Sequence, residues 1–96
     1  IISPQALMFM NNGQIRAAAM SLAESFENKA NSQAVMVGYE TVISRVPSLT
    51  EKQAISAFIT KQEKSYREVG RKDARKLALA DFVQVLFGLN EFVYVN

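Results

Sequence analysis

Apolar side chains recur at intervals of three and four residues along most of the chain, which is the spacing of one face of an α-helix. Residues 14–28 carry this pattern at Ile15, Ala18, Ala19, Leu22 and Phe26. Residues 32–46 carry it at Val35, Tyr39, Val42 and Val46. Residues 50–68 carry the same pattern at Ile55, Phe58, Ile59 and Tyr66, and Val69 continues it. We therefore predict three amphipathic helices over these ranges, each burying its apolar face.

The start of the chain also has the signals of a helix. Ser3 followed by Pro4 suits an N-cap and a first helical position. Asn12 and Gly13 both tolerate the left-handed conformation that ends helices, so this segment either stops there or bends into the next helix. We predict a first helix up to this point, with both alternatives open.

Capping residues predict the boundaries of the later helices. Pro47 is expected to end the helix before it, because the residue before a proline is pushed out of the helical region. Thr50 and Gln53 have the three-residue spacing of a capping box, which predicts the start of the next helix. Gly70 is expected to form the C-cap of that helix.

The last helix is predicted at residues 74–87, with Asp73 as its N-cap and Gly88 at its end. Ten of the thirteen residues from 77 to 89 are apolar, and a helix that is apolar on nearly all sides is surrounded by others. The pattern therefore predicts an all-α fold, a single bundle of four to five helices with the last long helix central. Residues 1–96 are long enough to bury one core and are expected to form a single domain.

The composition excludes several kinds of chemistry. The chain has no histidine and no cysteine, which rules out disulfides, covalent haem attachment and the catalytic triads that depend on these residues. There is no glycine-rich phosphate loop, and no apolar run approaches the roughly 20 residues of a membrane span. No catalytic, cofactor-binding or metal-binding residue is predicted, and this chain alone is not expected to be an enzyme.

Asp81 is the most unusual acidic residue. Its neighbours Ala80, Phe82 and Val83 are apolar, and it falls within the helix that is expected to be most buried. A buried carboxylate must be paired or hydrogen-bonded, and the candidate partners are Arg45 and a capping N–H group. We interpret Asp81 and Arg45 as a possible buried polar site with a structural role, and a functional role for Asp81 is the alternative.

Basic residues gather in one stretch of a chain whose net charge is only +2. Residues 61–76 contain seven basic and three acidic residues. A possible docking surface for another domain consists of Lys64, Arg67, Arg71, Lys72 and Arg75. Ordinary solvated helix surface is the first interpretation of this stretch. Nucleic-acid binding is the least favoured, because acidic residues dilute the basic ones.

Three passages of the chain resemble a planctomycete-specific domain of unknown function, and specifically its C-terminal part. The opening passage is Ser3-Pro4-Gln5-Ala6-Leu7, followed by Met10-Asn11-Asn12. The middle passage is residues 39–45 with Pro47, Ser48, Thr50 and Glu51. The closing passage is Ala78-Leu79-Ala80-Asp81-Phe82, then Leu86 and Asn90-Glu91-Phe92-Val93-Tyr94-Val95. The likeness covers nearly the whole chain, and its closing passage is the most specific.

The resemblance implies a context and no mechanism. Domains of this kind close large exported proteins that often carry planctomycete-type cytochrome c modules. An extracytoplasmic location (periplasmic or cell-surface) and partners among the other domains of the parent protein, including cytochrome c-like ones, follow from it as expectations. The chain begins with Ile1 and not with Met, so we expect a fragment of a longer multidomain protein.

Three functions are compatible with these observations. The leading hypothesis is a non-catalytic structural or interaction module that closes a larger exported protein. The first alternative is part of a substrate-binding region whose catalytic residues lie upstream. The second alternative is a small nucleic-acid-binding helical bundle. No cofactor is expected in any of them.

Overall fold

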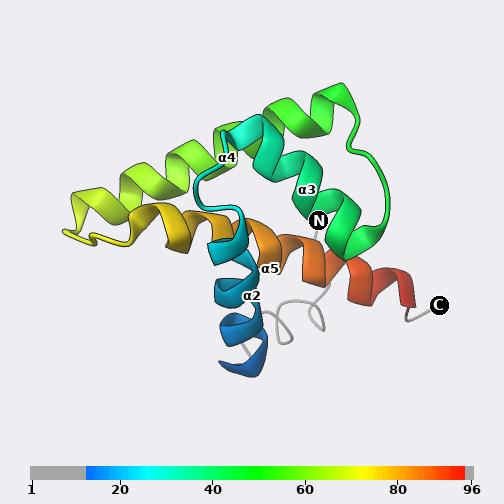
Figure 1. The fold of residues 1–96 in the computed structure, drawn as a ribbon, viewed down its shortest axis with the longest axis horizontal. Helices are drawn as coiled ribbons and strands as arrows, with labels where there is room; N and C mark the ends of the chain where they lie inside the picture. Colours follow the sequence, from blue (N-terminus) through cyan, green and yellow to red (C-terminus); the bar gives the residue numbers. More distant parts are fainter. Residues whose placement is uncertain (1–12, 95–96) are drawn as a thin grey trace.

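The computed structural model describes residues 13–94, with the backbone alone for residues 90–94. Within this range the chain forms four helices and no strand. The helices are α2 (Gly13–Ser25), α3 (Asn31–Ile43), α4 (Leu49–Glu68) and α5 (Ala74–Tyr94), which are arranged as shown in Figure 1. The all-α fold class predicted from the sequence is therefore confirmed. The helix predicted before Asn12 lies outside the described residues.

Helix α5 is the centre of the bundle, as the sequence predicted. Each of the other three helices packs against it, and α3 also packs against α4. In Figure 1, α4 and α5 form an antiparallel pair, and α2 crosses α5 at a steep angle. The fully buried side chains of α5 include Ala78, Leu79, Ala80, Phe82, Val83 and Leu86. Burial of this apolar surface is the main stabilising contribution, at roughly 25 cal/mol per Å².

Helices α3 and α5 approach each other closely at Gly38. A Cβ atom at this position would lie 2.6 Å from Cε2 of Phe82 and 3.3 Å from Cδ1 of Leu86. The neighbouring Tyr39 ring stacks on Phe82 with 6.2 Å between the ring centroids. The absence of a side chain at Gly38 therefore allows two large residues of α5 to pack against the backbone of α3.

The start of α4 differs from the sequence prediction, which placed a capping box at Thr50 and Gln53. Ser48 is the N-cap instead: its hydroxyl accepts a hydrogen bond from the backbone N–H of Glu51 at 3.1 Å. The Glu51 carboxylate in turn accepts one from the Ser48 N–H at 2.8 Å. Both pairs have the same spacing, but only Glu51 offers a charged acceptor, and charge-assisted hydrogen bonds are the stronger ones.

The end of α4 confirms the predicted role of Gly70. Its φ of 83° is in the left-handed region, where glycine has no steric cost. The Gly70 N–H donates to the Arg67 carbonyl, and the Arg71 N–H donates to the Tyr66 carbonyl, both at 3.0 Å. This is a Schellman motif. Val69, which was predicted to be buried, lies in this turn and is 75% exposed, because α4 ends one residue earlier.

Helix α5 does not end at Gly88, contrary to the sequence prediction. Gly88 is helical and buried, and the helix continues to Tyr94. A glycine ends a helix when it takes a left-handed conformation, and inside a helix it costs only about 0.5–1 kcal/mol relative to alanine. Packing of the central helix against its neighbours offsets a cost of this size.

Helix α3 ends earlier than the predicted Pro47, at Ile43, and Ser44 is its C-cap. Ser44 has φ 56° and ψ 37°, a left-handed conformation that is unfavourable for a residue with a Cβ atom. We expect Ser44→Gly to raise the free energy of unfolding by about 0.5–1 kcal/mol, measured by urea titration. The matched control is Ser21→Gly, at an exposed position inside α2. It should lower stability by about 0.5 kcal/mol, and a loss of stability in both variants would contradict the prediction.

Candidate functional site

Asp81 lies at the junction of three helices. Its carboxylate accepts hydrogen bonds from Arg16 of α2 at 2.8 Å, from Gln62 of α4 at 2.8 Å and from the Tyr66 hydroxyl of α4 at 2.9 Å. Arg16 also donates to the Gln84 side-chain oxygen at 2.6 Å. The Asp81 side chain is 16% exposed. We call these five residues the Asp81 cluster.

The Asp81 cluster has the properties of a structural junction. Its carboxylate oxygens already accept from three donors on two helices, which leaves little capacity for a further ligand. Burial and the hydrogen bond to Asp81 both raise the pKa of Tyr66, so its hydroxyl stays protonated as a donor. The cluster therefore fixes the relative positions of α2, α4 and α5.

The Asp81→Asn variant tests this structural role. The amide keeps one acceptor oxygen but turns its NH₂ group towards the donors of the cluster and removes the charge that Arg16 faces. We expect the free energy of unfolding to fall by about 1–3 kcal/mol in a urea titration, the usual cost of an unsatisfied buried group. A variant more stable than the parent would contradict the structural role, because relief of strain at a site of function often raises stability.

Arg45 is not the partner of Asp81, which corrects the pairing considered from the sequence. Its guanidinium forms two hydrogen bonds with the Glu51 carboxylate, at 2.8 and 2.7 Å. It also lies over the Tyr39 ring, 5.1 Å from the ring centroid. The partner that sequence reasoning missed is Arg16. The sequence feature that could have identified Arg16 is that it is the one basic residue of α2 and lies next to the apolar face of that helix.

The Arg45 hydrogen bonds and the Ser48 N–H hold the pKa of Glu51 at about 2. A carboxyl group with a lowered folded-state pKa stabilises the fold above its unfolded pKa, and this contribution is lost as the pH falls through about 2. We expect the carboxyl ¹³C titration of Glu51 to have its midpoint near pH 2, and Arg45→Gln to move it towards 4.5. An unchanged midpoint in the variant would show that Arg45 is not the cause.

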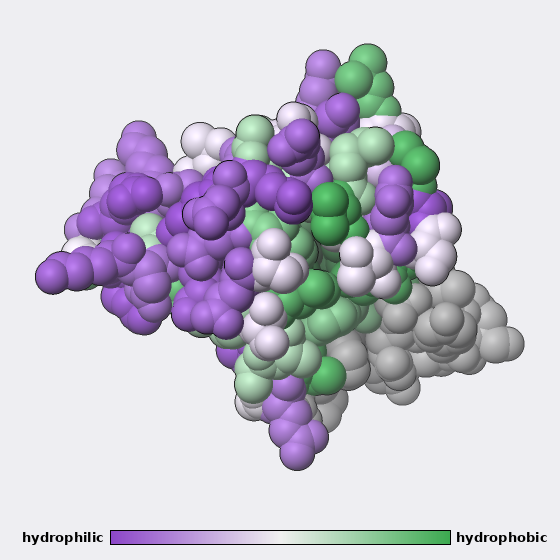
Figure 2. Space-filling view, in the orientation of Figure 1, coloured by the Kyte–Doolittle hydropathy of each residue, from purple (hydrophilic) through white to green (hydrophobic). Residues whose placement is uncertain are grey.

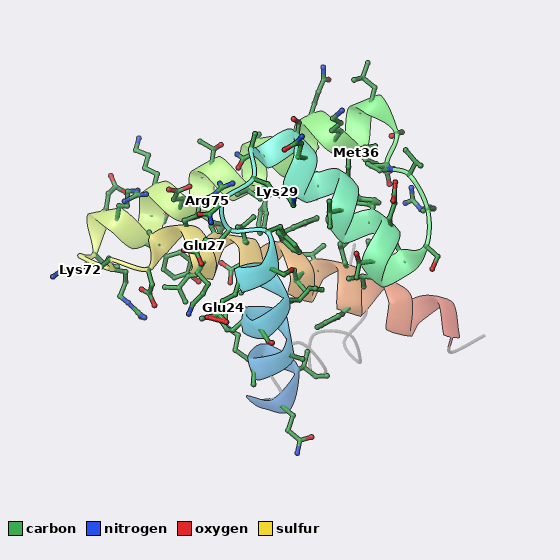
Figure 3. The ribbon with its side chains drawn as sticks, in the orientation of Figure 1. Glu24, Glu27, Lys29, Met36, Lys72 and Arg75 are labelled. Carbon is green, nitrogen blue, oxygen red and sulfur yellow. The ribbon has the colours of Figure 1, made fainter. Side chains whose placement is uncertain are left out.

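Arg75 was predicted to belong to the docking surface, but it is mostly enclosed, with 22% of its side chain exposed. It donates to the Lys29 carbonyl at 2.5 Å and to the Glu27 carbonyl at 3.3 Å, both in the turn between α2 and α3. It also donates to Asn31 at 2.5 Å and to Glu63 at 3.4 Å. Figure 3 shows Arg75 beside Glu27 and Lys29. It joins α5 to this turn and to α4.

The other four residues of the predicted docking surface lie along α4 and in the turn that follows. Arg67 is paired with Glu63, and Arg71 forms two hydrogen bonds with Asp73, at 3.0 and 2.9 Å. The guanidinium of Arg71 lowers the pKa of Asp73. Lys64 and Lys72 are exposed and have no carboxylate within 4.0 Å among the side chains that the structure describes, those of residues 13–89.

These residues surround one end of the molecule, which we call the α4–α5 tip. Its exposed side chains are Lys61, Lys64, Ser65, Arg67, Glu68, Val69, Arg71 and Lys72. Figure 2 shows this end of the α4–α5 pair covered by hydrophilic residues, and Figure 3 places Lys72 at its extremity. The tip is therefore a polar surface with one strongly exposed apolar side chain, Val69.

The described part of the chain shows no other candidate centre. Among the side chains of residues 13–89, no group of three acidic residues is placed to hold a metal ion. No described helix is long and apolar enough to cross a bilayer. Every buried side-chain nitrogen or oxygen of residues 13–89 has a hydrogen-bond partner. Comparison of the chain with family models, curated proteins and solved structures finds no match.

Proposed function

We propose that this chain is a non-catalytic structural or interaction module of a larger exported protein, which is the context that its resemblance to the planctomycete-specific domain of unknown function implies. The observation that supports this proposal is the α4–α5 tip. There, Lys64 on α4 and Val69 and Lys72 in the following turn are exposed, while Arg16 and Asp81 inside the bundle bond to each other. The binding partner is another domain of the same parent protein, and the resemblance suggests a cytochrome c-like domain among the candidates.

The chemistry of the described residues favours binding over catalysis. Proton transfer near neutral pH without histidine or cysteine needs a carboxylate or lysine with a strongly shifted pKa that is open to substrate. Asp81 is the acid best placed by burial, and its oxygens are occupied by Arg16, Gln62 and Tyr66. We therefore assign no reaction to this chain alone.

The test compares lysine reactivity in this chain with that in the longer parent protein. Acetylation by a soluble reagent, read by mass spectrometry, should be several-fold slower at Lys64 and Lys72 in the parent, because docking covers them. Lys52 is the control, since it lies near the start of α4, at the end of that helix opposite the tip. Equal rates at Lys64 and Lys72 in both proteins would contradict docking through the tip.

A further inference from the structure

The charges of the α4–α5 tip are unevenly compensated. The three acidic residues of this region are Glu63, Glu68 and Asp73. Glu63 is shared between Arg67 and Arg75, and Asp73 is bound by Arg71. Among the side chains of residues 13–89, three lysines and one acid of this stretch have no ion-pair partner: Lys61, Lys64, Lys72 and Glu68. The tip therefore presents net positive charge that the bundle itself does not neutralise.

These lysines are arranged along one surface. Lys61 and Lys64 are three residues apart, so they lie on the same outer face of α4. Lys72 follows in the turn, and Val69 is exposed between the two groups. A shallow hollow of about 480 Å³ runs along this helix face and is lined by Thr60, Glu63, Lys64, Arg67 and Glu68.

The backbone of the tip is held in place before any partner binds. The two hydrogen bonds of the Schellman motif fix the turn after Glu68, and the Arg71–Asp73 pair spans the residues that lead into α5. A backbone that is already ordered loses little conformational entropy on binding, so the ordering cost falls mainly on the lysine side chains.

We propose that the α4–α5 tip binds an acidic segment of a partner protein, with carboxylates at Lys61, Lys64 and Lys72 and an apolar side chain on Val69. This inference rests on the proposed function and names the chemistry of its partner. A peptide is favoured over a nucleic acid because a polypeptide can place neutral residues opposite Glu63 and Glu68, whereas nucleic-acid phosphates carry charge at every step.

The experiment measures binding of a fluorescein-labelled, glutamate-rich decapeptide with one central leucine, by anisotropy in 50 mM salt. The double variant Lys64→Gln, Lys72→Gln should weaken binding about 3- to 10-fold, since each exposed ion pair contributes modestly to affinity. The matched control, Lys29→Gln with Lys52→Gln, removes the same charge outside the tip and should change affinity less than twofold. Val69→Ser should also weaken binding, and circular dichroism checks that each variant remains helical.

Three outcomes would overturn the acidic-partner proposal. The first is that the unsubstituted chain does not bind the decapeptide. The second is that the control double variant loses as much affinity as the tip double variant. The third is that a single-stranded DNA decamer binds more tightly than the decapeptide through the same lysines. None of them alters the lysine acetylation result, which tests docking through the tip whatever the partner is. A failure of the partner chemistry is therefore distinguishable from a failure of the proposed function.

Discussion

Leu86→Ala is expected to lower the free energy of unfolding by about 2–5 kcal/mol, the usual cost of emptying a buried leucine site. Leu86 is completely buried on the central helix α5 and lies against the backbone of α3 at Gly38. Helices α2, α3 and α4 all pack on α5, so the cavity would have rigid walls on several sides and would collapse only in part.

The measurement is the urea midpoint at an unchanged m-value, which reports stability and not a change in the surface exposed on unfolding. Leu49→Ala is the matched control, because Leu49 is 71% exposed at the start of α4. The control should change stability by less than about 0.5 kcal/mol. Similar midpoints for the two variants would show that α5 is not the centre of the bundle.

The helical nature and order of the four described elements could be predicted because both depend on local signals. The spacing of apolar residues sets the buried face of each helix, and the apolar character of residues 77–89 identified α5 as central. Gly70 was also identifiable, since a left-handed C-cap is a position that favours glycine strongly.

The exact helix ends could not be predicted because several residues compete for each cap. Ser48 and Thr50 both have a suitable partner three residues later, and the contact of Glu51 with Arg45 belongs to the folded loop alone. Ser44 gives no sequence signal for a left-handed C-cap, so the sequence favours Pro47 as the end of this helix. Gly88 continues the helix, because tertiary packing outweighs its propensity.

The partner of Asp81 depends on how distant helices cross. Arg16 and Asp81 are 65 residues apart, and nothing in the neighbourhood of either residue specifies the other. The same reason explains Arg75, which looks like a surface cation in sequence but reaches the carbonyls of the turn between α2 and α3. Pairing between helices is a property of the assembled bundle, whereas periodicity belongs to each helix alone.

Gly38→Ala gives the strongest test of the packing between α3 and α5. The new Cβ would lie 2.6 Å from Cε2 and 2.7 Å from Cζ of the Phe82 ring, which is closer than carbon atoms can approach. Phe82 is fully buried, so its ring cannot swing into solvent, and overpacking of this kind costs about 1–3 kcal/mol. The better helix propensity of alanine offsets about 1 kcal/mol of that cost, so we expect a net loss of up to about 2 kcal/mol in urea titration.

Two further variants separate the steric cost from the change in helix propensity. At Gly13, a Cβ atom meets no atom of the described residues within 4 Å, so Gly13→Ala should leave stability equal or raise it by up to about 1 kcal/mol. Combining Gly38→Ala with Phe82→Leu should cost less than the sum of the two single changes, because the smaller leucine leaves room for the added methyl group. Strict additivity would mean that Gly38 and Phe82 do not contact each other. A stabilised Gly38→Ala variant would show that α3 lies further from α5 than the 2.6 Å approach to Phe82 requires.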